Sequence, residues 1–441
     1  MTGSVTEARL PYEAAAAAGR ARLLHAAAAL LLVAAAAGWA TAIRPQPFSD
    51  WLYYWEAARG AIAYERGGIM LFVLRVLQKL PLAPYAVMLL INLASALVIL
   101  AIAYRADGRR IGLASALVYA YLLAITPYFA VVQFDLSATA LLCAGFGFLA
   151  LDAPAARRPW VILAATLLVA GAVSSRPQFL LVLLVFAALL GTTAAMARAA
   201  LFTTRRPTML SALVLMVGAL LGFAGDSALR AQAGRSEAVR TNSGVTLYAG
   251  LLSSGTSPPT CGHWSLQAMR DARADAHLPL QRAVSTRLRQ QPPGHWLEVM
   301  RCKAGMIVFP EAYALSWSLG APDVVDRLAA VDGDTHLQAT AAYLYRIEDL
   351  GYRVLLVLIY AFALAAVVRS ARKGQWLPAM LPLFWLASFW LVHAIFEIQA
   401  RYFLSLFVVL PLMAVSSTHR NGNYVPRESA WADSPSSVRQ S

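Results

Sequence analysis

Long uninterrupted apolar runs dominate the hydropathy pattern of this chain. Ten of them are long enough to predict membrane-spanning helices, because about 20 consecutive apolar residues in a helix cover the hydrocarbon core of a bilayer. The predicted spans are residues 22–43, 84–104, 111–127, 134–151, 160–175, 178–197, 208–225, 352–369, 376–392 and 402–418. The pattern therefore predicts an all-α polytopic membrane protein with about ten transmembrane helices.

Two further apolar stretches are too short to count as spans. Residues 68–80 come shortly after the first span, and we expect them to form a short helix at the membrane interface. Residues 300–317 have a short apolar core that Pro310 and Glu311 interrupt. Counting this stretch as a span would also invert the pattern of basic residues in the later loops. We interpret it as an amphipathic or surface helix.

The composition agrees with a membrane protein. Hydrophobic residues make up 59% of the chain and charged residues 14%, whereas soluble proteins average about 25% charged residues. The formal net charge is +14, but most basic residues flank apolar runs and act as topology signals that place both termini in the cytoplasm. No basic stripe interleaved with aromatic residues occurs in a soluble segment, so we expect no nucleic-acid partner.

The spans and the basic residues together divide the chain into five parts. These are a cytoplasmic tail (1–21), a transmembrane module (22–225) with a first outer loop (44–83), an extracytoplasmic loop domain with an interfacial helix (226–350), C-terminal transmembrane helices (351–418) and a disordered cytoplasmic tail (419–441). The first apolar run is interpreted as a span rather than a cleaved signal peptide, because no clean small-residue cleavage site follows it.

The predicted outer loops carry most of the ionisable side chains that are candidates for chemistry. Asp50 lies directly after the first span, among aromatic residues that sit readily at the headgroup level. The other candidates on this face are Glu56, Asp135, Arg176, Glu397 and Arg401. A simple channel would not require this asymmetry, which indicates an active site facing outward.

Four short motifs resemble those of the type C (GT-C) superfamily of membrane glycosyltransferases, in the branch with protein O-mannosyltransferases and aminoarabinose-to-lipid-A transferases. They are Ser49-Asp50-Trp51-Leu52-Tyr53-Tyr54-Trp55-Glu56-Ala57-Ala58, Thr126-Pro127, Ser175-Arg176-Pro177-Gln178 and Glu397-Ile398-Gln399-Ala400-Arg401-Tyr402. The resemblance implies a polyprenyl-phosphate sugar donor, a glycan, lipid or protein acceptor, and a place in a bacterial cytoplasmic (inner) membrane with the site facing outward.

The predicted outer loop adds a second likeness. Thr241-Asn242-Ser243-Gly244, Leu247-Tyr248-Ala249-Gly250 and Gly262-His263-Trp264 are similar to a succession seen in some bacterial members. The resemblance implies substrate contacts for Asn242, Tyr248, His263 and Trp264. Many members have paired acidic residues in the first loop, whereas Ser49 precedes Asp50 here. This departure weakens metal coordination by adjacent carboxylates, and a divalent cation (Mg²⁺ or Mn²⁺) stays open as a cofactor.

Sugar transfer from a polyprenyl phosphate needs a base for the acceptor and a site for the departing phosphate. Asp50 is the predicted general base, because a carboxylate with an ordinary pKa near 3.9 is ionised at neutral pH. Arg176 and Arg401, together with Tyr402, are predicted to bind the donor phosphate, because guanidinium groups stay protonated and form forked contacts with phosphate.

The remaining candidates have supporting parts in this hypothesis. Asp135 and Glu397 are weaker catalytic candidates that could orient the acceptor or pair with the arginines. Trp51, Tyr54 and Glu56 are predicted substrate contacts in the first outer loop.

Each prediction has a structural alternative. Asp50 could cap a helix that begins at Trp51, and Arg176 could anchor a helix end at the headgroups. Glu397 and Arg401 are four residues apart and could form a structural pair on one helix. Asp135 could simply begin a span, and the aromatic residues of the first loop could belong to an interfacial belt.

Two other classes of function stay open. An envelope polysaccharide polymerase or ligase also uses polyprenyl carriers, although it does not require an acid after the first span. A transporter or flippase predicts charges within the spans, which are nearly free of them. No nucleotide-binding motif occurs, which favours a lipid-linked donor. Cys261 and Cys302 both fall in the predicted outer loop, where a disulfide and two reduced cysteines are both compatible with the sequence, whereas Cys143 lies in a span.

Overall fold

The computed structural model describes most of the chain. The described residues are 6–42, 50–61, 67–106, 112–151, 159–196, 202–232, 238–252, 262, 266–308, 313–319, 335–372, 376–406 and 408–409. They form helices joined by turns and short extended connections, with no strand among them. The all-α class predicted from the apolar runs is confirmed.

Five helices contain segments that are long and apolar enough to cross a membrane. They are α1 (Thr6–Ala42), α4 (Pro84–Ala106), α8 (Phe179–Met196), α9 (Phe202–Gln232) and α16 (Thr335–Arg372). This finding fits a membrane protein. α1 also extends through most of the predicted N-terminal tail, because it begins at Thr6 rather than near residue 22.

Shorter apolar helices occupy most of the other predicted spans. They are α5 (Leu113–Ala124), α6 (Asp135–Leu151), α7 (Pro159–Ser175) and α17 (Trp376–Ile395). α5 ends before the predicted boundary, since Pro127 cannot continue an α-helix and residues Thr126–Ala130 form the 3-10 helix η1. Most of the last predicted span, 402–418, lies outside the described residues, so a total of ten spans stays a prediction.

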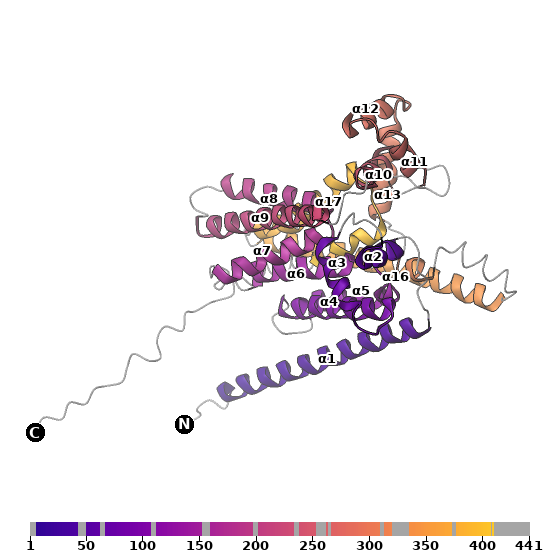
Figure 1. Cartoon of the computed structure of the whole chain (residues 1–441). Coiled ribbons are helices and arrows are strands. Elements are labelled where there is room, and N and C mark those ends of the chain that lie inside the picture. Colours follow the sequence, from indigo (N-terminus) through magenta and orange to yellow (C-terminus); the bar gives the residue numbers. More distant parts are fainter. Residues whose placement is uncertain are drawn as a thin grey trace, which may run out of the picture.

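The apolar helices pack side by side as a bundle, seen in the left and centre of Figure 1. α6 packs against α4 and α7, α9 packs against α7 and α8, and α17 packs against α8 and α16. α9 and α7 approach with their backbones: a Cβ on Gly222 would lie 2.4 Å from the carbonyl oxygen of Ala170. Small residues that allow such contact are typical of helix interfaces inside membranes.

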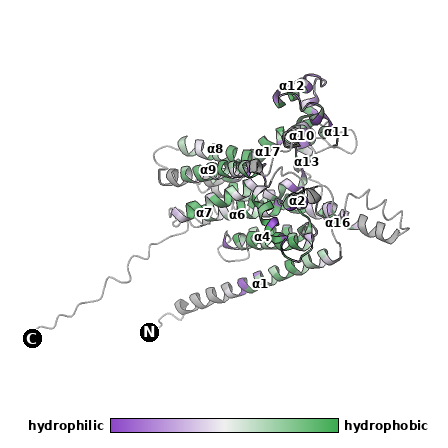
Figure 2. Ribbon diagram, viewed as in Figure 1, coloured by the Kyte–Doolittle hydropathy of each residue, from purple (hydrophilic) through white to green (hydrophobic). Residues whose placement is uncertain are grey.

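Apolar side chains also cover the outer surface of the bundle. Figure 2 shows mostly hydrophobic colouring along these helices, with hydrophilic colouring concentrated around α11 and α12. Leu163 and Leu167 of α7, for example, are each 58% exposed. Inside a bilayer these side chains would face lipid rather than water.

A second group of helices lies beyond one end of the bundle, at the upper right of Figure 1. It comprises α10 (Ala238–Leu252), α11 (Leu266–Ala274), α12 (Leu280–Arg289) and α13 (His295–Val308). Val245, Tyr248, Ala249 and other buried residues of α10, α11 and α12 form a small core of their own. We call these four elements the outer helices. They belong to the predicted loop domain, and their position outside the membrane stays a prediction.

Further short helices pack against the bundle. α2 (Asp50–Arg59) and α3 (Gly68–Leu77) follow the first span, and α3 agrees with the short helix expected over 68–80. The single helix expected over 300–317 is wrong, because α13 ends at Val308 and a separate helix, α14 (Ala314–Leu319), follows it. Pro310 falls between the two helices, in a stretch outside the described residues.

Candidate functional site

The candidate site is centred on an ion pair between Arg176 and Asp135. Arg176 follows the last residue of α7, and Asp135 is the first residue of α6. The Arg176 Nη2 group donates to Asp135 Oδ2 and also to Gln133 Oε1, at 2.6 Å. Both charged residues are buried, at 3% and 2% exposure. Pairing with an arginine, one of the two supporting parts predicted for Asp135, is therefore the contact that the structure shows.

Two tyrosines complete the surroundings of this pair. The hydroxyl of Tyr128, in η1, donates to Asp135 Oδ2 at 2.8 Å. The hydroxyl of Tyr54, in α2, accepts from Arg176 Nη1 at 3.4 Å. Asp135 Oδ1 and Arg176 Nε are buried and have no hydrogen-bond partner among the described residues. The pair therefore keeps one acceptor and one donor that a substrate could use.

α2 brings the position of Asp50 close to this pair. α2 begins at Asp50, so Asp50 and Tyr54 lie one turn apart on the same helix face, about 6 Å along the axis. The side chains of Asp50 and Trp51 lie outside the described residues. The structure agrees with a helix starting at this position, which also leaves the predicted alternative of Asp50 as an N-cap open.

α3 holds α2 in place. The guanidinium Nε of Arg75 donates to the carbonyl of Ala58 at 3.2 Å, and the amide of Gln78 donates to the carbonyl of Trp55 at 3.1 Å. The carbonyl of Ala58 is among the last four of α2, which lack partners within a helix. α3 is itself fixed to the bundle, because the backbone N–H of Gly68 donates to Asp226 Oδ1 of α9 at 3.0 Å.

The second half of the site comes from the C-terminal end of the described chain. Arg401 lies in the 3-10 helix η4 (Ala400–Phe403), and its guanidinium carbon is 4.4 Å from the ring centroid of Trp317 in α14. The Tyr402 hydroxyl donates to Glu397 Oε1 at 3.0 Å, and Gln399 Nε2 donates to the same oxygen. Arg401 is 3% exposed and Glu397 is 4% exposed.

The structural alternative of a helical pair formed by Glu397 and Arg401 is wrong. Residues 397–399 are not helical, and Gln399 has the extended backbone angles φ −135° and ψ 149°. The i,i+4 spacing therefore does not place the two side chains one turn apart on a helix. Glu397 accepts hydrogen bonds from Gln399 and Tyr402.

The two halves form one site. Arg176 and Arg401 interact electrostatically with each other, and both interact with the hydroxyl groups of Tyr128 and Tyr402. Asp135 also acts on Tyr402 across the boundary between the halves. Asp135 compensates the charge of Arg176, and Arg401 brings a second cation into the same buried region.

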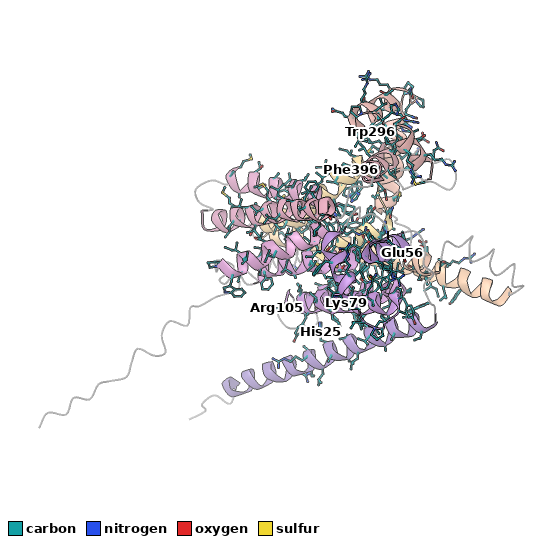
Figure 3. The ribbon with its side chains drawn as sticks, in the orientation of Figure 1. His25, Glu56, Lys79, Arg105, Trp296 and Phe396 are labelled. Atoms are coloured by element: carbon teal, nitrogen blue, oxygen red, sulfur yellow. The ribbon has the colours of Figure 1, made fainter. Side chains whose placement is uncertain are left out.

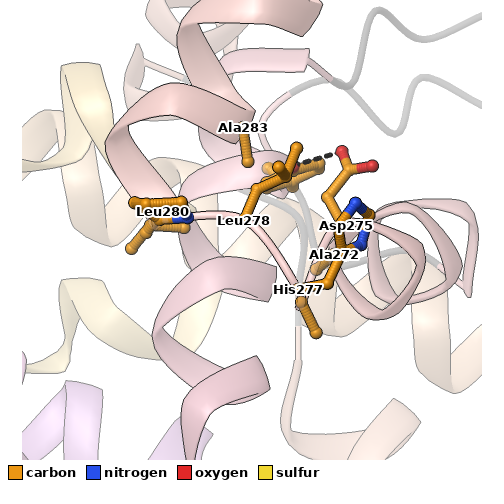
Figure 4. A pocket seen from close by; sticks show the side chains of 9 residues that line it. Ala272, Asp275, His277, Leu278, Leu280 and Ala283 are labelled. Carbon is orange, nitrogen blue, oxygen red and sulfur yellow. Dashed lines mark hydrogen bonds between the residues drawn. The ribbon is translucent and has the colours of Figure 1, made fainter.

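Tyr248, one of the predicted substrate residues of the outer loop, lies among the outer helices rather than beside Arg176 and Asp135. Tyr248 is buried in the outer helices, and its hydroxyl donates to Asp275 at 2.6 Å. Arg287 binds the same carboxylate at 2.5 Å and holds the pKa of Asp275 below its ordinary value. With His277 and several small or apolar residues, Tyr248 and Asp275 line a pocket of about 390 Å³ (Figure 4). Tyr248 therefore belongs to this pocket among the outer helices.

The remaining predicted residues have mixed outcomes. Glu56 forms an exposed ion pair with Arg59 on α2, at 3.6 Å. The side chains of Asn242, His263 and Trp264 lie outside the described residues. Cys302 is disulfide-bonded and Cys143 is free and buried, whereas the predicted partner Cys261 lies outside the described residues. No group of three His, Cys, Asp or Glu residues suited to a metal occurs in the described part.

Several residues of the site were not predicted. Gln133 accepts a hydrogen bond from Arg176, and Tyr128 donates one to Asp135. Trp317 offers its ring to the guanidinium of Arg401. Gln133 and Tyr128 both fall within seven residues of Asp135, and this proximity was the one available signal. Trp317 lies at the end of the 300–317 stretch, and nothing local to it indicates an arginine partner.

Comparison of the chain with protein-family models, with curated proteins and with solved structures finds no match, so the functional assignment rests on the residues of this site.

Proposed function

We propose that this protein is an integral membrane glycosyltransferase that moves a sugar from a polyprenyl-phosphate donor to a glycan, lipid or protein acceptor on the extracytoplasmic face. The observation that carries the proposal is the meeting of Arg176 and Arg401, two buried arginines from distant parts of the chain, close to the helix that begins at Asp50.

The two arginines suit the phosphate of the donor. A phosphate between them would reduce their mutual repulsion and would accept charge-assisted hydrogen bonds from both guanidinium groups. Trp317 and Asp135 hold these groups in fixed places, by stacking and by ion pairing respectively. The apolar bundle around the site suits the isoprenoid part of the donor, which is as apolar as lipid.

Asp50 is the proposed general base. Asp135 and Glu397 already accept hydrogen bonds from Arg176, Tyr128, Tyr402 and Gln399, which makes them better suited to holding the site together. In the proposed step the acceptor oxygen attacks the anomeric carbon and Asp50 takes the acceptor proton. The bond between the anomeric carbon and the phosphate oxygen breaks, and the polyprenyl phosphate leaves between the arginines.

The test compares cells that carry wild type, Asp50→Asn, Arg401→Ala, Asp349→Asn or no protein. Asp349 pairs with Arg353 on the exposed surface of α16, so Asp349→Asn controls for the same chemical change elsewhere. Mass spectrometry of envelope lipids, glycans and glycoproteins should show one defined sugar in the wild type and the control. Asp50→Asn should lose this sugar at normal protein abundance, and the polyprenyl-phosphate sugar should accumulate.

Other outcomes would contradict the proposal. Normal sugar transfer by Asp50→Asn would exclude Asp50 as the base. Shortened polymers with accumulated repeat units would indicate a polymerase instead. Identical glycans and lipids in all five strains would exclude a glycosyltransferase, and accumulation of the lipid-linked sugar on one side of the membrane would indicate a flippase.

A further inference from the structure

The turn that carries Glu397 is held by α17 and η4 on one side and by the outer helices and Gly262 on the other. This turn, residues 396–399, joins the end of α17 to η4 and the site. The backbone N–H of Glu397 donates to the carbonyl of Thr246 in α10 at 2.9 Å, and the N–H of Ile398 donates to the carbonyl of Gly262 at 2.7 Å. Phe396 lies where α17 meets the outer helices (Figure 3). The position of the turn therefore depends on elements outside the bundle.

Lys303 of α13 makes the most concentrated contact with this region. Its Nζ lies 2.9 Å from the carbonyl oxygen of His393, 3.0 Å from that of Ala394 and 3.0 Å from that of Phe396. The last carbonyls of a helix lack partners within the helix, and a cation at this end also compensates the helix dipole. Lys303, which is only 2% exposed, therefore caps the C-terminus of α17.

Two glycines show how closely the outer helices approach this end of α17. A Cβ on Gly250 of α10 would lie 2.3 Å from the carbonyl oxygen of Ile395. A Cβ on Gly262, which has a positive φ of 74°, would lie 2.6 Å from Cε of Lys303. Only a residue without a side chain fits at either position, so the lysine stem and the turn are enclosed on several sides.

The geometry excludes a direct role for Lys303 in binding the donor phosphate. An ammonium group has three N–H donors and no acceptor. Three carbonyl oxygens within 3.0 Å occupy all three donors of Lys303. An arginine would not replace it well, because its planar fork cannot converge on three carbonyls at one helix end.

We propose that Lys303 is a positioning residue: by capping α17 it fixes the 396–399 turn and so determines where Glu397 and Arg401 lie in the site. The catalytic consequence rests on the proposed function, whereas the effect on the turn does not. The outer helices thereby hold one of the two phosphate-binding arginines in place. A change in the packing of the outer helices would move Lys303, and the 396–399 turn and Arg401 would move with it.

The test measures the turn directly, by hydrogen exchange and mass spectrometry on the full-length protein in lipid nanodiscs at pH 6, below the Lys303 pKa of about 7. Lys303→Met keeps the length of the side chain and removes the charge and all three donors. In this variant, peptides that contain Glu397 and Ile398 should exchange at least about 10-fold faster, since the buried charge-assisted hydrogen bonds to the end of α17 are lost. Peptides of α6 and α7 should be unchanged. Lys79→Met, the same change at an exposed lysine, should match the wild type.

A kinetic readout separates positioning from a general loss of structure. With the purified transferase and its polyprenyl-phosphate donor, Lys303→Met should raise the KM for the donor about 10-fold and leave the KM for the acceptor unchanged. Arg401→Ala is expected to change both constants in the same way. If Lys303→Met is not recovered folded, Lys303→Gln takes its place. Glutamine keeps two N–H donors, so the same direction and a smaller effect are expected.

The outcomes distinguish the two proposals. Wild-type exchange of the turn in a folded Lys303→Met or Lys303→Gln protein would overturn the positioning proposal, whatever the enzyme assays show. Faster exchange of the turn in a protein whose wild type transfers no sugar would support the positioning of the turn and refute the proposed function. Faster exchange with an unchanged KM for the donor would refute the link between Lys303 and Arg401.

Discussion

The strongest test of the site is removal of the charge on Asp135. Asparagine has nearly the same shape and can still accept a hydrogen bond from Tyr128. It leaves the guanidinium of Arg176 buried at 3% exposure without its carboxylate partner. Asp135→Asn should therefore destabilise the folded protein without creating a cavity.

The size of this effect follows from the burial of the pair. Two unit charges about 4 Å apart interact by about 4 kcal/mol in an effective dielectric constant of about 20. Removal of one partner of a buried pair costs about 3–5 kcal/mol, since the other charge stays without compensation. We expect Asp135→Asn to lower the free energy of unfolding by about 4 kcal/mol. Removing both charges, with Arg176→Met in the same chain, should recover at least about 2 kcal/mol of this loss.

Unfolding by SDS in mixed detergent micelles measures the difference. Asp349→Asn is the matched control, because Asp349 and Arg353 lie 2.7 Å apart with side chains 33% and 48% exposed. Exposed pairs of this kind contribute about 0.3–0.5 kcal/mol. If Asp135→Asn costs no more than Asp349→Asn, the pair is not a buried ion pair and the description of the site is wrong.

Three further predictions concern packing, hydrogen bonding and protonation. Gly250→Ala should lower the yield of folded protein in size-exclusion chromatography, because its Cβ would overlap the carbonyl oxygen of Ile395. Gly305→Ala is the control, because a Cβ there would have no atom within 4 Å. It should preserve the yield and add up to about 1 kcal/mol of stability. Tyr121→Phe should lower the free energy of unfolding in the SDS titration by about 1–3 kcal/mol, because it removes a buried hydroxyl that forms hydrogen bonds with two other tyrosines at 3.0 Å each. Tyr343→Phe should have no effect, because Tyr343 is 65% exposed. Burial lowers the pKa of Lys303 from 10.5 to about 7. Between these values the unfolded chain holds a proton that the folded protein has lost, so stability should rise with pH by up to about 1.4 kcal/mol per unit in the wild type, and Lys303→Met should lack this slope.

The candidate site was partly predictable because its charged residues stand out in an apolar sequence. Arg176, Arg401, Asp135 and Glu397 were all named as candidates from their positions at the ends of apolar runs. Their partners were harder to predict. Trp317 of α14 contacts Arg401 of η4, and these two segments lie far apart in the chain.

The residues that cap α3, α14 and α17 could not be predicted from the sequence for a related reason. Asp226 and Glu348 are buried carboxylates that accept hydrogen bonds from the first backbone N–H groups of α3 and α14. Each helix is capped by a residue from a distant helix, whereas capping motifs in a sequence indicate only caps from neighbouring residues. The three bonds of Lys303 at the end of α17 are of the same kind.

The helical class and the positions of most apolar helices follow from the sequence. Its long apolar runs exceed what a water-soluble core would use, and in a bilayer a backbone must satisfy its own hydrogen bonds, which a helix does locally. Three features follow only from the packing of the folded chain. Arg176 and Arg401 share one buried region, the 300–317 stretch divides into two helices, and the outer helices contact the 396–399 turn. These outcomes depend on contacts between residues far apart in the chain, and the periodicity of apolar residues carries no information about which helices become neighbours.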